Sequence, residues 1–402
     1  MKYVVVLGDG MADYPIPELD YKTPLAHART PNLDFLASRG RMGMVKTVPD
    51  GMPPGSDVAN LSVMGYDPTR YYTGRSPLEA IAMGVELKPG DVAFRCNLVT
   101  LSDEPEFTQK RMIDYSSDEI TSAESAQLIA AVKERFDDED IRFYPGVSYR
   151  HLMVWTNGPL EVELTPPHDI SDRVIAEYLP RGKGSEVLLG LMLESNRFLP
   201  CHPVNQFRVH RGLRPATSLW FWGQGVKPAL PLFAEKYGLV GSVIAAVDLT
   251  KGLGLCAGLR AVNVPGATGN ITTDFRGKAR AALKELDDGQ DFVYIHIEAP
   301  DEAGHRGELE IKIKAIEEID EKVIGELLSG LPKFGEYRLM VLPDHPTPLS
   351  VRTHTAEEVP FVIFDSRQHY PNKASTYDEA SARSTGLRFA KGHELMDYFI
   401  KG

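Results

Sequence analysis

The run Leu339-Met340-Val341-Leu342-Pro343-Asp344-His345-Pro346-Thr347-Pro348 joins a strand signal to two chemically active side chains. Its first four residues are apolar and typical of a buried strand of a parallel sheet. The strand stops at a proline, and a carboxylate and an imidazole follow side by side. Ligands of α/β proteins bind beyond the carboxyl ends of such strands. The run therefore predicts a ligand site at the exit of a core strand.

Two further apolar runs end in the same kind of residue. Val4-Val5-Val6-Leu7-Gly8 leads into Asp9, and the run from Phe292 to Ile297 precedes Asp301-Glu302-Ala303-Gly304-His305. His354 adds another imidazole shortly after His345. Oxygen and nitrogen ligands from Asp and His suit Mn, Zn, Mg or Fe, and a pair of ions can clamp a phosphoryl group. Any one of these residues alone would be an ordinary loop acid or surface histidine, but together at strand ends they predict a metal site.

The order of the predicted elements indicates an α/β fold. Toward the C-terminus, strand-like runs alternate with helical patterns at 275–286 and 308–328. This alternation is typical of a doubly wound, mostly parallel sheet. Strands with few helices predict a smaller α+β insert at 91–181, between the core segments 1–90 and 182–402.

Length and composition are those of a globular protein with a sizeable core. The chain has 402 residues, which is more than one average domain. A net charge of -12 argues against a nucleic-acid or anionic-membrane partner, while leaving room for a local basic pocket. The cysteines form no CxxC motif, and we find neither a signal-like N-terminus nor an apolar run of about 20 residues. These features predict a cytoplasmic protein with free thiols.

Ser56 lies where a Pro/Gly-rich loop, 49–55, turns into a helical pattern. A serine at this junction has two interpretations. It caps the first free amides of the helix, or it is a nucleophile whose phosphorylated oxygen the helix N-terminus stabilises. Local sequence alone favours the cap.

Local signals also define a turn and a short helix. Gly8 and Gly10 flank Asp9 and predict a tight strand exit in which the backbone comes close to a ligand. Thr30 as N-cap, Pro31 in the first position and a stop at residue 40 predict a helix.

Three basic residues are candidates for binding an anion. Arg150 lies in a strand-like run, Arg214 ends a basic loop, and Lys251 follows another strand-like run. Arginine binds phosphate or carboxylate through two parallel hydrogen bonds. A surface ion pair is about as good an interpretation of Arg150, and an ordinary solvated charge is the alternative for Lys251.

With these residues in place, the chain resembles the cofactor-independent phosphoglycerate mutases, in particular their archaeal-type branch, within the alkaline phosphatase superfamily. Asp301 to His305 is similar to the D-x-x-G-H element of the family, and Asp344-His345 with His354 to its D-H…H-T element. Gly8-Asp9-Gly10 is similar to its N-terminal metal carboxylate, and Gly55-Ser56-Asp57 falls where the family carries its phosphorylated serine. Four elements in the same order are a specific signal. The resemblance implies an alkaline-phosphatase-like core with a smaller inserted domain that covers the substrate.

The resemblance also implies two divalent metal ions and no bisphosphoglycerate. Mn²⁺ is the first expectation, with Mg²⁺, Zn²⁺ or Co²⁺ as alternatives. The ligands implied for one ion are Asp301, His305 and His354. The ligands implied for the other are Asp9, Asp344, His345 and the Ser56 oxygen.

The activity that the resemblance implies is the interconversion of 3-phosphoglycerate and 2-phosphoglycerate, a small phosphorylated substrate. Ser56 would take the phosphoryl group and return it to the other hydroxyl of the glycerate. Lys251 falls where the family has a phosphate-neutralising lysine, and Arg150 and Arg214 are the candidates for the substrate's carboxylate and phosphate.

Two departures from the family pattern leave the phosphoryl acceptor open. Asn60 stands where many relatives carry a histidine, and the segment from Leu219 to Gly225 replaces a more aliphatic, arginine-containing stretch. Both features are similar to a bacterial side branch for which a homoserine kinase role has been proposed, although the chain has no Walker-type phosphate loop. A metal-dependent phosphatase, in which water takes the phosphate, is the other alternative. The sequence indicates no oligomeric state.

Overall fold

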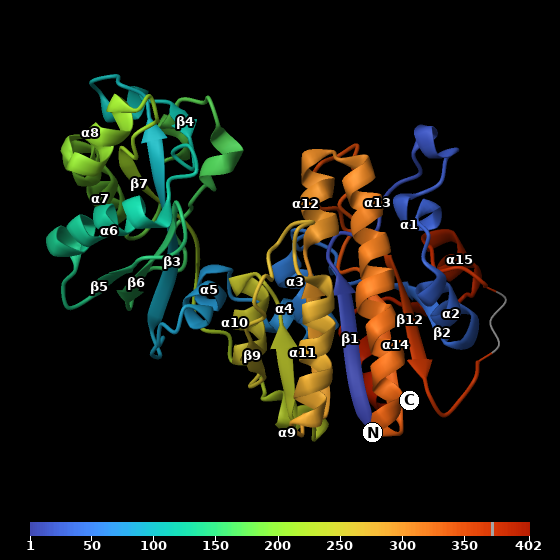
Figure 1. Cartoon of the computed structure of the whole chain (residues 1–402). Helices are drawn as coiled ribbons and strands as arrows, with labels where there is room; N and C mark the ends of the chain where they lie inside the picture. Colours follow the sequence, from blue (N-terminus) through green and yellow to red (C-terminus); the bar gives the residue numbers. More distant parts are fainter. Residues whose placement is uncertain (371–373) are drawn as a thin grey trace. The chain divides into compact units, whose positions relative to one another are not determined.

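The protein is described by a computed structural model that covers residues 1–370 and 374–402. It divides into two compact units (Figure 1). The core unit comprises Met1–Tyr72 and Ala229–Gly402, and the inserted unit comprises Thr73–Pro228.

The core unit is built on an eight-stranded sheet with the order β13-β2-β12-β11-β1-β10-β8-β9. Its strands are β1 (Lys2–Gly8), β2 (Arg41–Val45), β8 (Gly241–Ile244), β9 (Arg260–Val262), β10 (Phe292–Ile297), β11 (Tyr337–Leu342), β12 (Val359–Asp365) and β13 (Arg388–Phe389). Strand β1 runs parallel to both β10 and β11, and β8 and β9 extend the parallel half. Only β12, among the described strands of this sheet, runs antiparallel to its neighbours. The predicted α/β class with a mostly parallel sheet is confirmed.

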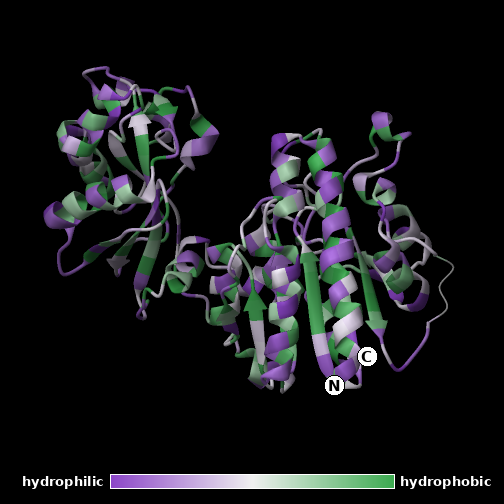
Figure 2. Cartoon of the chain, viewed as in Figure 1, coloured by the Kyte–Doolittle hydropathy of each residue, from purple (hydrophilic) through white to green (hydrophobic). Residues whose placement is uncertain are grey.

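The central strands are buried on both faces, which explains their continuous apolar sequence. Val4 pairs in register with Val293 on one side and with Leu339 on the other, and all three belong to one apolar cluster. The neighbouring Tyr3 points to the opposite face, because side chains alternate along a strand. In Figure 2 the central strands are hydrophobic along most of their length, while hydrophobic and hydrophilic residues alternate along the helices in front of them.

Helices cover both faces of this sheet, as a doubly wound fold requires. On one face, α11 (Phe275–Asp287) packs beside the continuous helical segment α13–η6–α14 (Leu309–Gly330), whose middle section η6 is π-helical (Figure 1). On the other face, Phe399 of α16 meets Tyr3 with ring centroids 5.7 Å apart. The core unit also contains α1 (Pro24–His27), α2 (Pro31–Arg39), α3 (Ser56–Val63), α4 (Pro68–Tyr71), α9 (Phe233–Tyr237), α10 (Asp248–Cys256), α12 (Ala299–Arg306), α15 (Glu379–Ser384) and α16 (Glu394–Lys401). No helix within the described residues has both the length and the apolar character needed to cross a membrane.

The inserted unit is an antiparallel sheet flanked by helices. Its strands are β3 (Asp91–Leu101), β4 (Met112–Asp114), β5 (Ile141–Tyr144), β6 (Arg150–Thr156) and β7 (Ser218–Gly225). Strand β3 is central and pairs antiparallel with β4, β6 and β7. The main helices are α5 (Ser76–Ala82), α6 (Ser122–Phe136), α7 (Ser185–Phe198) and α8 (Pro203–His210).

This unit extends beyond both ends of the insert at 91–181 that the sequence predicts. Strand β7 lies far along the chain yet pairs with β3, where Trp220 faces Asn97. Leu188 and Met192 of α7 enter the same apolar core. The strand-like run that contains Trp220 therefore belongs to the inserted sheet, although the sequence alone placed it with the core.

Helix α2 begins and ends where the sequence predicts, but its cap is different. The Thr30 side chain makes no capping hydrogen bond. Instead, Asp320 of η6 accepts the backbone N–H of Leu33 at 2.7 Å and that of Asn32 at 3.2 Å. The cap comes from a distant helix, so local sequence could not reveal it.

We predict that Asp320→Ala lowers the free energy of unfolding by about 1–3 kcal/mol, because two N-terminal amides of α2 lose their acceptor. Thr30→Val, which removes only the hydroxyl of the expected cap, should change it by less than about 0.5 kcal/mol. Equilibrium urea unfolding followed by far-UV circular dichroism would measure both. Tryptophan fluorescence is unsuitable, because all three tryptophans lie in the inserted unit. The reverse ranking of the two variants would contradict the assignment.

Candidate functional site

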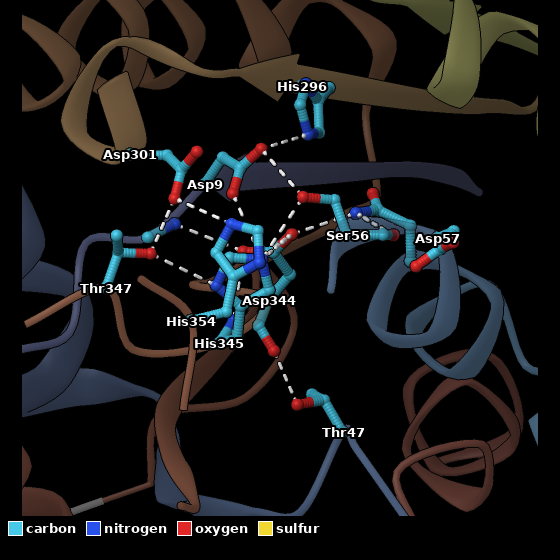
Figure 3. A network of polar contacts seen from close by, with 12 residues as sticks. Asp9, Thr47, Ser56, Asp57, His296, Asp301, Asp344, His345, Thr347 and His354 are labelled. Atoms are coloured by element: carbon cyan, nitrogen blue, oxygen red, sulfur yellow. Dashed lines mark hydrogen bonds and ion pairs between the residues drawn. The ribbon is translucent and has the colours of Figure 1, made fainter. Parts of the chain in front are cut away.

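The carboxyl ends of three neighbouring strands meet at the middle of the core sheet. Asp9 follows β1, Asp344 follows β11, and Asp301 lies in α12, directly after β10. The strands end level with one another, since Leu7 pairs with both His296 and Leu342. Figure 3 shows the three carboxylates converging, and each is at least 95 % buried.

Gly10 allows the exit of β1 to approach α12. Its backbone has a φ of 62°, in the left-handed region that favours glycine. A Cβ at this position would lie 2.8 Å from Asp301 Cα and 2.6 Å from Thr347 Oγ1. The predicted tight exit therefore brings the backbone close to the other ligand-bearing segments.

One candidate metal group consists of Asp301, His305 and His354. Asp301 and His305 are four residues apart on α12 and so share one face of the helix. His305 Nε2 lies 3.3 Å from Asp301 Oδ2, and His354 Nε2 lies 3.5 Å from Asp301 Oδ1. The two Nε2 atoms are 2.9 Å apart, so the three side chains can converge on one ion.

The second group surrounds Ser56. Its Oγ lies 3.1 Å from His345 Nε2 and 3.4 Å from Asp9 Oδ2. His345 Nε2 in turn lies 3.5 Å from Asp9 Oδ1 and 3.4 Å from Asp344 Oδ2. The structure thus brings together all four residues expected at this ion.

Ser56 is not the cap of its helix. Gly55 occupies the cap position and Ser56 is the first residue of α3, with no capping bond from its side chain. Asp57 accepts the N–H of Val58 at 2.9 Å instead. The cap interpretation that local sequence favoured is therefore wrong, and the hydroxyl faces the carboxylates and His345 (Figure 3).

The cluster carries more buried negative charge than its hydrogen bonds balance. Burial raises the pKa of Asp9 well above its usual range, and the charges of Asp344 and Asp301 add to the effect. Asp9 Oδ1 is buried and accepts no hydrogen bond from the described residues. An orphaned carboxylate oxygen beside other carboxylates and imidazoles fits a divalent cation.

Asp301 behaves differently from Asp9. Burial opposes its ionisation, but hydrogen bonds from His305 and His354 hold its pKa well below the usual range. The same hydrogen bond to Asp301 raises the pKa of His305 to about 9. Without an ion, this corner of the site is therefore a carboxylate paired with a protonated imidazole.

Several residues that support the site were missed from the sequence. Thr347 Oγ1 donates to Asp301 Oδ1 at 2.5 Å and lies 3.3 Å from His345 Nδ1. His296 of β10 places Nε2 3.1 Å from Asp9 Oδ2. A histidine inside an otherwise apolar strand was a signal that could have identified it.

Lys251 lies in α10, with Nζ 4.0 Å from Asp248 Oδ1. Burial lowers the pKa of Lys278 to about 8, and the charge of Lys251 adds to that effect. Lys278 Nζ donates to the His296 carbonyl at 3.1 Å. Lys251 is therefore near Lys278, whose side chain binds the backbone of His296 in β10.

The two candidate arginines lie in the inserted unit and differ in their surroundings. Arg214 Nη1 is 3.1 Å from Asp114 Oδ2 and 3.6 Å from Asp118 Oδ1, so its charge is already paired. Arg150 is near Arg95: burial lowers the Arg95 pKa to about 10, and among its neighbours Arg150 contributes in the same direction.

Arg95 and Arg150, here called the arginine cluster, lie against aromatic rings. The Arg95 guanidinium lies 4.5 Å from the Trp222 ring centroid, and the His168 ring lies 5.2 Å from Trp222. Arg150 lies 5.6 Å from the ring of Tyr149. Arginine held against aromatic faces is suited to binding an anionic ligand.

Carboxylates and imidazoles gathered in two adjoining groups, with a serine hydroxyl at one of them, form the kind of centre used by metal-dependent phosphotransfer enzymes. Comparisons with known proteins agree. Residues 37–205 match the family model described as 2,3-bisphosphoglycerate-independent phosphoglycerate mutase. Relatives that carry this name are 53% and 51% identical to the chain over its whole length, so the chain belongs to this family.

The similarity extends over whole chains. A Geobacter sulfurreducens protein named "Probable 2,3-bisphosphoglycerate-independent phosphoglycerate mutase" is 53% identical over 400 residues, covering 100% of both chains. The 2,3-bisphosphoglycerate-independent phosphoglycerate mutase of Methanothrix thermoacetophila is 51% identical over 403 residues, again covering 100% of both. Among solved structures, the PH0037 protein of Pyrococcus horikoshii matches with a TM-score of 0.83 at 27% identity, covering 100% of this chain and 96% of that one.

We predict that Mn²⁺ binding at the Asp301 group strengthens as pH rises toward 9, because His305 must lose its proton to become a ligand. The sign follows from the raised pKa: the ion pair with Asp301 is complete below about pH 6.5 and is lost as pH passes through 9. Mn²⁺ titrations followed by electron paramagnetic resonance should show affinity rising up to about tenfold per pH unit. In His305→Gln this dependence should disappear; an equally steep dependence there would contradict the assignment.

Proposed function

We propose that the protein interconverts 3-phosphoglycerate and 2-phosphoglycerate through a phosphoserine at Ser56. The observation that carries the proposal is the position of Ser56 Oγ, 3.1 Å from His345 Nε2 and 3.4 Å from Asp9 Oδ2 at the start of α3. The names of the whole-length relatives support this choice of substrate. A cytoplasmic location is part of the proposal and is supported by the three cysteines, which are free thiols.

The two candidate groups would hold two divalent ions. Asp301, His305 and His354 would bind one, and Asp9, Asp344, His345 and Ser56 Oγ the other. Bound there, such ions would lower the pKa of the Ser56 hydroxyl and neutralise phosphoryl oxygens. Mn²⁺ is our first choice, since carboxylate and imidazole ligands suit it.

In the first step, Ser56 Oγ attacks phosphorus, its bond to phosphorus forms, and the bond from phosphorus to the substrate's O3 breaks. The departing O3 gains a proton while the serine hydroxyl loses one. In the second step, the O2 hydroxyl of the same glycerate attacks the phosphoserine: the bond from O2 to phosphorus forms, the bond from phosphorus to Ser56 Oγ breaks, and the proton lost by O2 is balanced by the one that Ser56 Oγ regains. Because Ser56 is the first residue of α3, a phosphoryl group on its Oγ would lie at the N-terminus of that helix, where negative charge is stabilised.

Basic residues would bind the rest of the substrate. Lys251, near the exit of β10, would balance phosphate charge. Arg150 would bind the substrate carboxylate through paired hydrogen bonds, while the neighbouring Arg95 is already paired with Glu79 at 2.9 Å. Arg214 is the weaker candidate, because Asp114 and Asp118 already pair with it.

We predict that Ser56→Ala lowers kcat for 2-phosphoglycerate formation by more than about 10³-fold, because the nucleophile is lost. The assay supplies 3-phosphoglycerate and Mn²⁺ without bisphosphoglycerate and couples the product to enolase. Ser62→Ala is the matched control, since Ser62 lies in the same helix, is buried and makes no side-chain hydrogen bond with the described residues. Full activity in Ser56→Ala would exclude the phosphoserine route.

Parallel samples separate the alternatives. Homoserine with ATP tests the kinase, and release of inorganic phosphate from 3-phosphoglycerate tests the phosphatase. Phosphohomoserine without mutase activity would keep the metal site and reassign the acceptor. Phosphate release that outpaces isomerisation would indicate that water takes the phosphoryl group.

We predict that Arg150→Gln raises the KM for 3-phosphoglycerate by about 10-fold or more, as expected when a charge-assisted hydrogen bond to substrate is lost. Arg214→Gln removes the same charge from the same unit and should leave KM within about twofold, because that arginine is paired with aspartates. Steady-state kinetics at saturating Mn²⁺ would measure both. Equal effects of the two substitutions would show that the arginine cluster is not the binding site.

A further inference from the structure

Strand β10 supplies none of the proposed metal ligands, yet two of its side chains are linked to ligands of the Ser56 group. Tyr294 is linked through Asn60, and His296 by direct contact with Asp9. Tyr294 and His296 are two residues apart and therefore share one face of the strand. Val293 and Ile295 point the other way, into the apolar cluster under α11. Tyr294 and His296 are both at least 99 % buried.

Tyr294 acts through Asn60. Its hydroxyl donates to Asn60 Oδ1 at 2.7 Å, which leaves the amide nitrogen of Asn60 facing the site. That nitrogen donates to Asp344 Oδ2 at 2.9 Å and to the Ser56 carbonyl at 2.8 Å. One side-chain amide thus fixes both a proposed metal ligand and the backbone of the proposed nucleophile.

The other oxygen of Asp344 is fixed by the backbone. Asp344 Oδ1 accepts the N–H of Gly10 at 3.1 Å and that of His345 at 2.9 Å. With Asn60 on Oδ2, the plane of this carboxylate is set from both sides. Asp344 therefore has one orientation, in which Oδ2 lies 3.4 Å from His345 Nε2.

His296 faces the second carboxylate. Its Nε2 lies 3.1 Å from Asp9 Oδ2, which is within ion-pair distance, and neither ring nitrogen makes a hydrogen bond with a described residue. Lys278 Nζ donates to the His296 carbonyl and fixes the backbone at this point. A ring nitrogen also lies within 4.8 Å of a carboxylate oxygen of Asp344, so this fully buried imidazole is placed to position Asp9 on the side of the Ser56 group.

We propose that β10 is the positioning element of the Ser56-side ion, with Tyr294 holding Asp344 through Asn60, and His296 holding Asp9. The proposal rests on the metal assignment made under the proposed function. Asp9 and Asp344 repel each other in a buried setting, so each would turn away from its neighbour unless a polar partner held it. Asn60 donates to Asp344, and the His296 ring contacts Asp9. Outer partners of this kind orient ligands and set metal affinity.

The test compares Mn²⁺ binding by the wild-type protein, Tyr294→Phe and His296→Leu, using electron paramagnetic resonance to measure free Mn²⁺. Each substitution should weaken one of the two sites by about 10–100-fold, the usual effect of losing an outer partner. The other site, at Asp301, should keep its wild-type affinity. At saturating Mn²⁺, the KM for 3-phosphoglycerate should stay near the wild-type value while kcat falls.

Tyr377→Phe is the matched control for a lost buried hydroxyl. Tyr377 is also buried in the core unit, and its hydroxyl donates to the Pro360 carbonyl at 3.0 Å rather than to a side chain of the site. Both Mn²⁺ sites should survive in this variant. If Tyr294→Phe binds Mn²⁺ as Tyr377→Phe does, or if both sites weaken equally, the proposal is overturned.

Asp344→Asn separates this proposal from the metal assignment on which it rests. Selective loss of one Mn²⁺ site in Asp344→Asn, with Tyr294→Phe and His296→Leu unaffected, keeps the assigned ligands and rejects the role of β10. Unchanged binding of two ions by Asp344→Asn would overturn both.

Discussion

Repulsion between three buried carboxylates is the constraint on which the site depends. Asp9, Asp301 and Asp344 meet because three parallel strands end level in the middle of the sheet. Burial leaves little water to screen their charges. The fold balances Asp301 with two imidazoles, but it leaves an oxygen of Asp9 without a hydrogen bond. The imbalance is local and lies beside Ser56, and it is an excess of negative charge that attracts cations.

A buried lysine behind the site holds the loops that carry these charges. Lys312 Nζ, on α13, donates to Asp13 Oδ2 at 2.7 Å, to the Thr347 carbonyl at 2.8 Å and to the Ala12 carbonyl at 3.3 Å. It thereby joins the segment after β1 to the segment after β11. Thr347 in turn donates to Asp301. A buried ion pair contributes little net stability, but it specifies one arrangement of the chain, which suits loops that must present ligands at fixed spacing.

The sequence was sufficient to predict those site residues that directly follow a core strand. Asp9, Asp344 and Asp301 each follow an apolar run, so both the fold class and the convergence of the carboxylates could be predicted. Contacts between distant segments could not: the hydrogen bond between Asn60 and Tyr294 and the cap that Asp320 gives α2 leave no local pattern. The predicted boundaries of the insert differ from those of the structure for the same reason, because β7 joins the inserted sheet only through its pairing with β3.

The first and last residues of the inserted unit lie close together in space, although they are far apart in the sequence. Thr73 Oγ1 donates to the Val226 carbonyl at 2.7 Å, and a Cβ on Gly225 would come within 2.0 Å of the Thr73 carbonyl oxygen. A segment whose ends are this close can be inserted into another protein at a single position in one loop. The catalytic core and the unit that carries the arginine cluster can therefore change independently during evolution. Exchange of the inserted unit alone would allow the same core to transfer a phosphoryl group to a different acceptor.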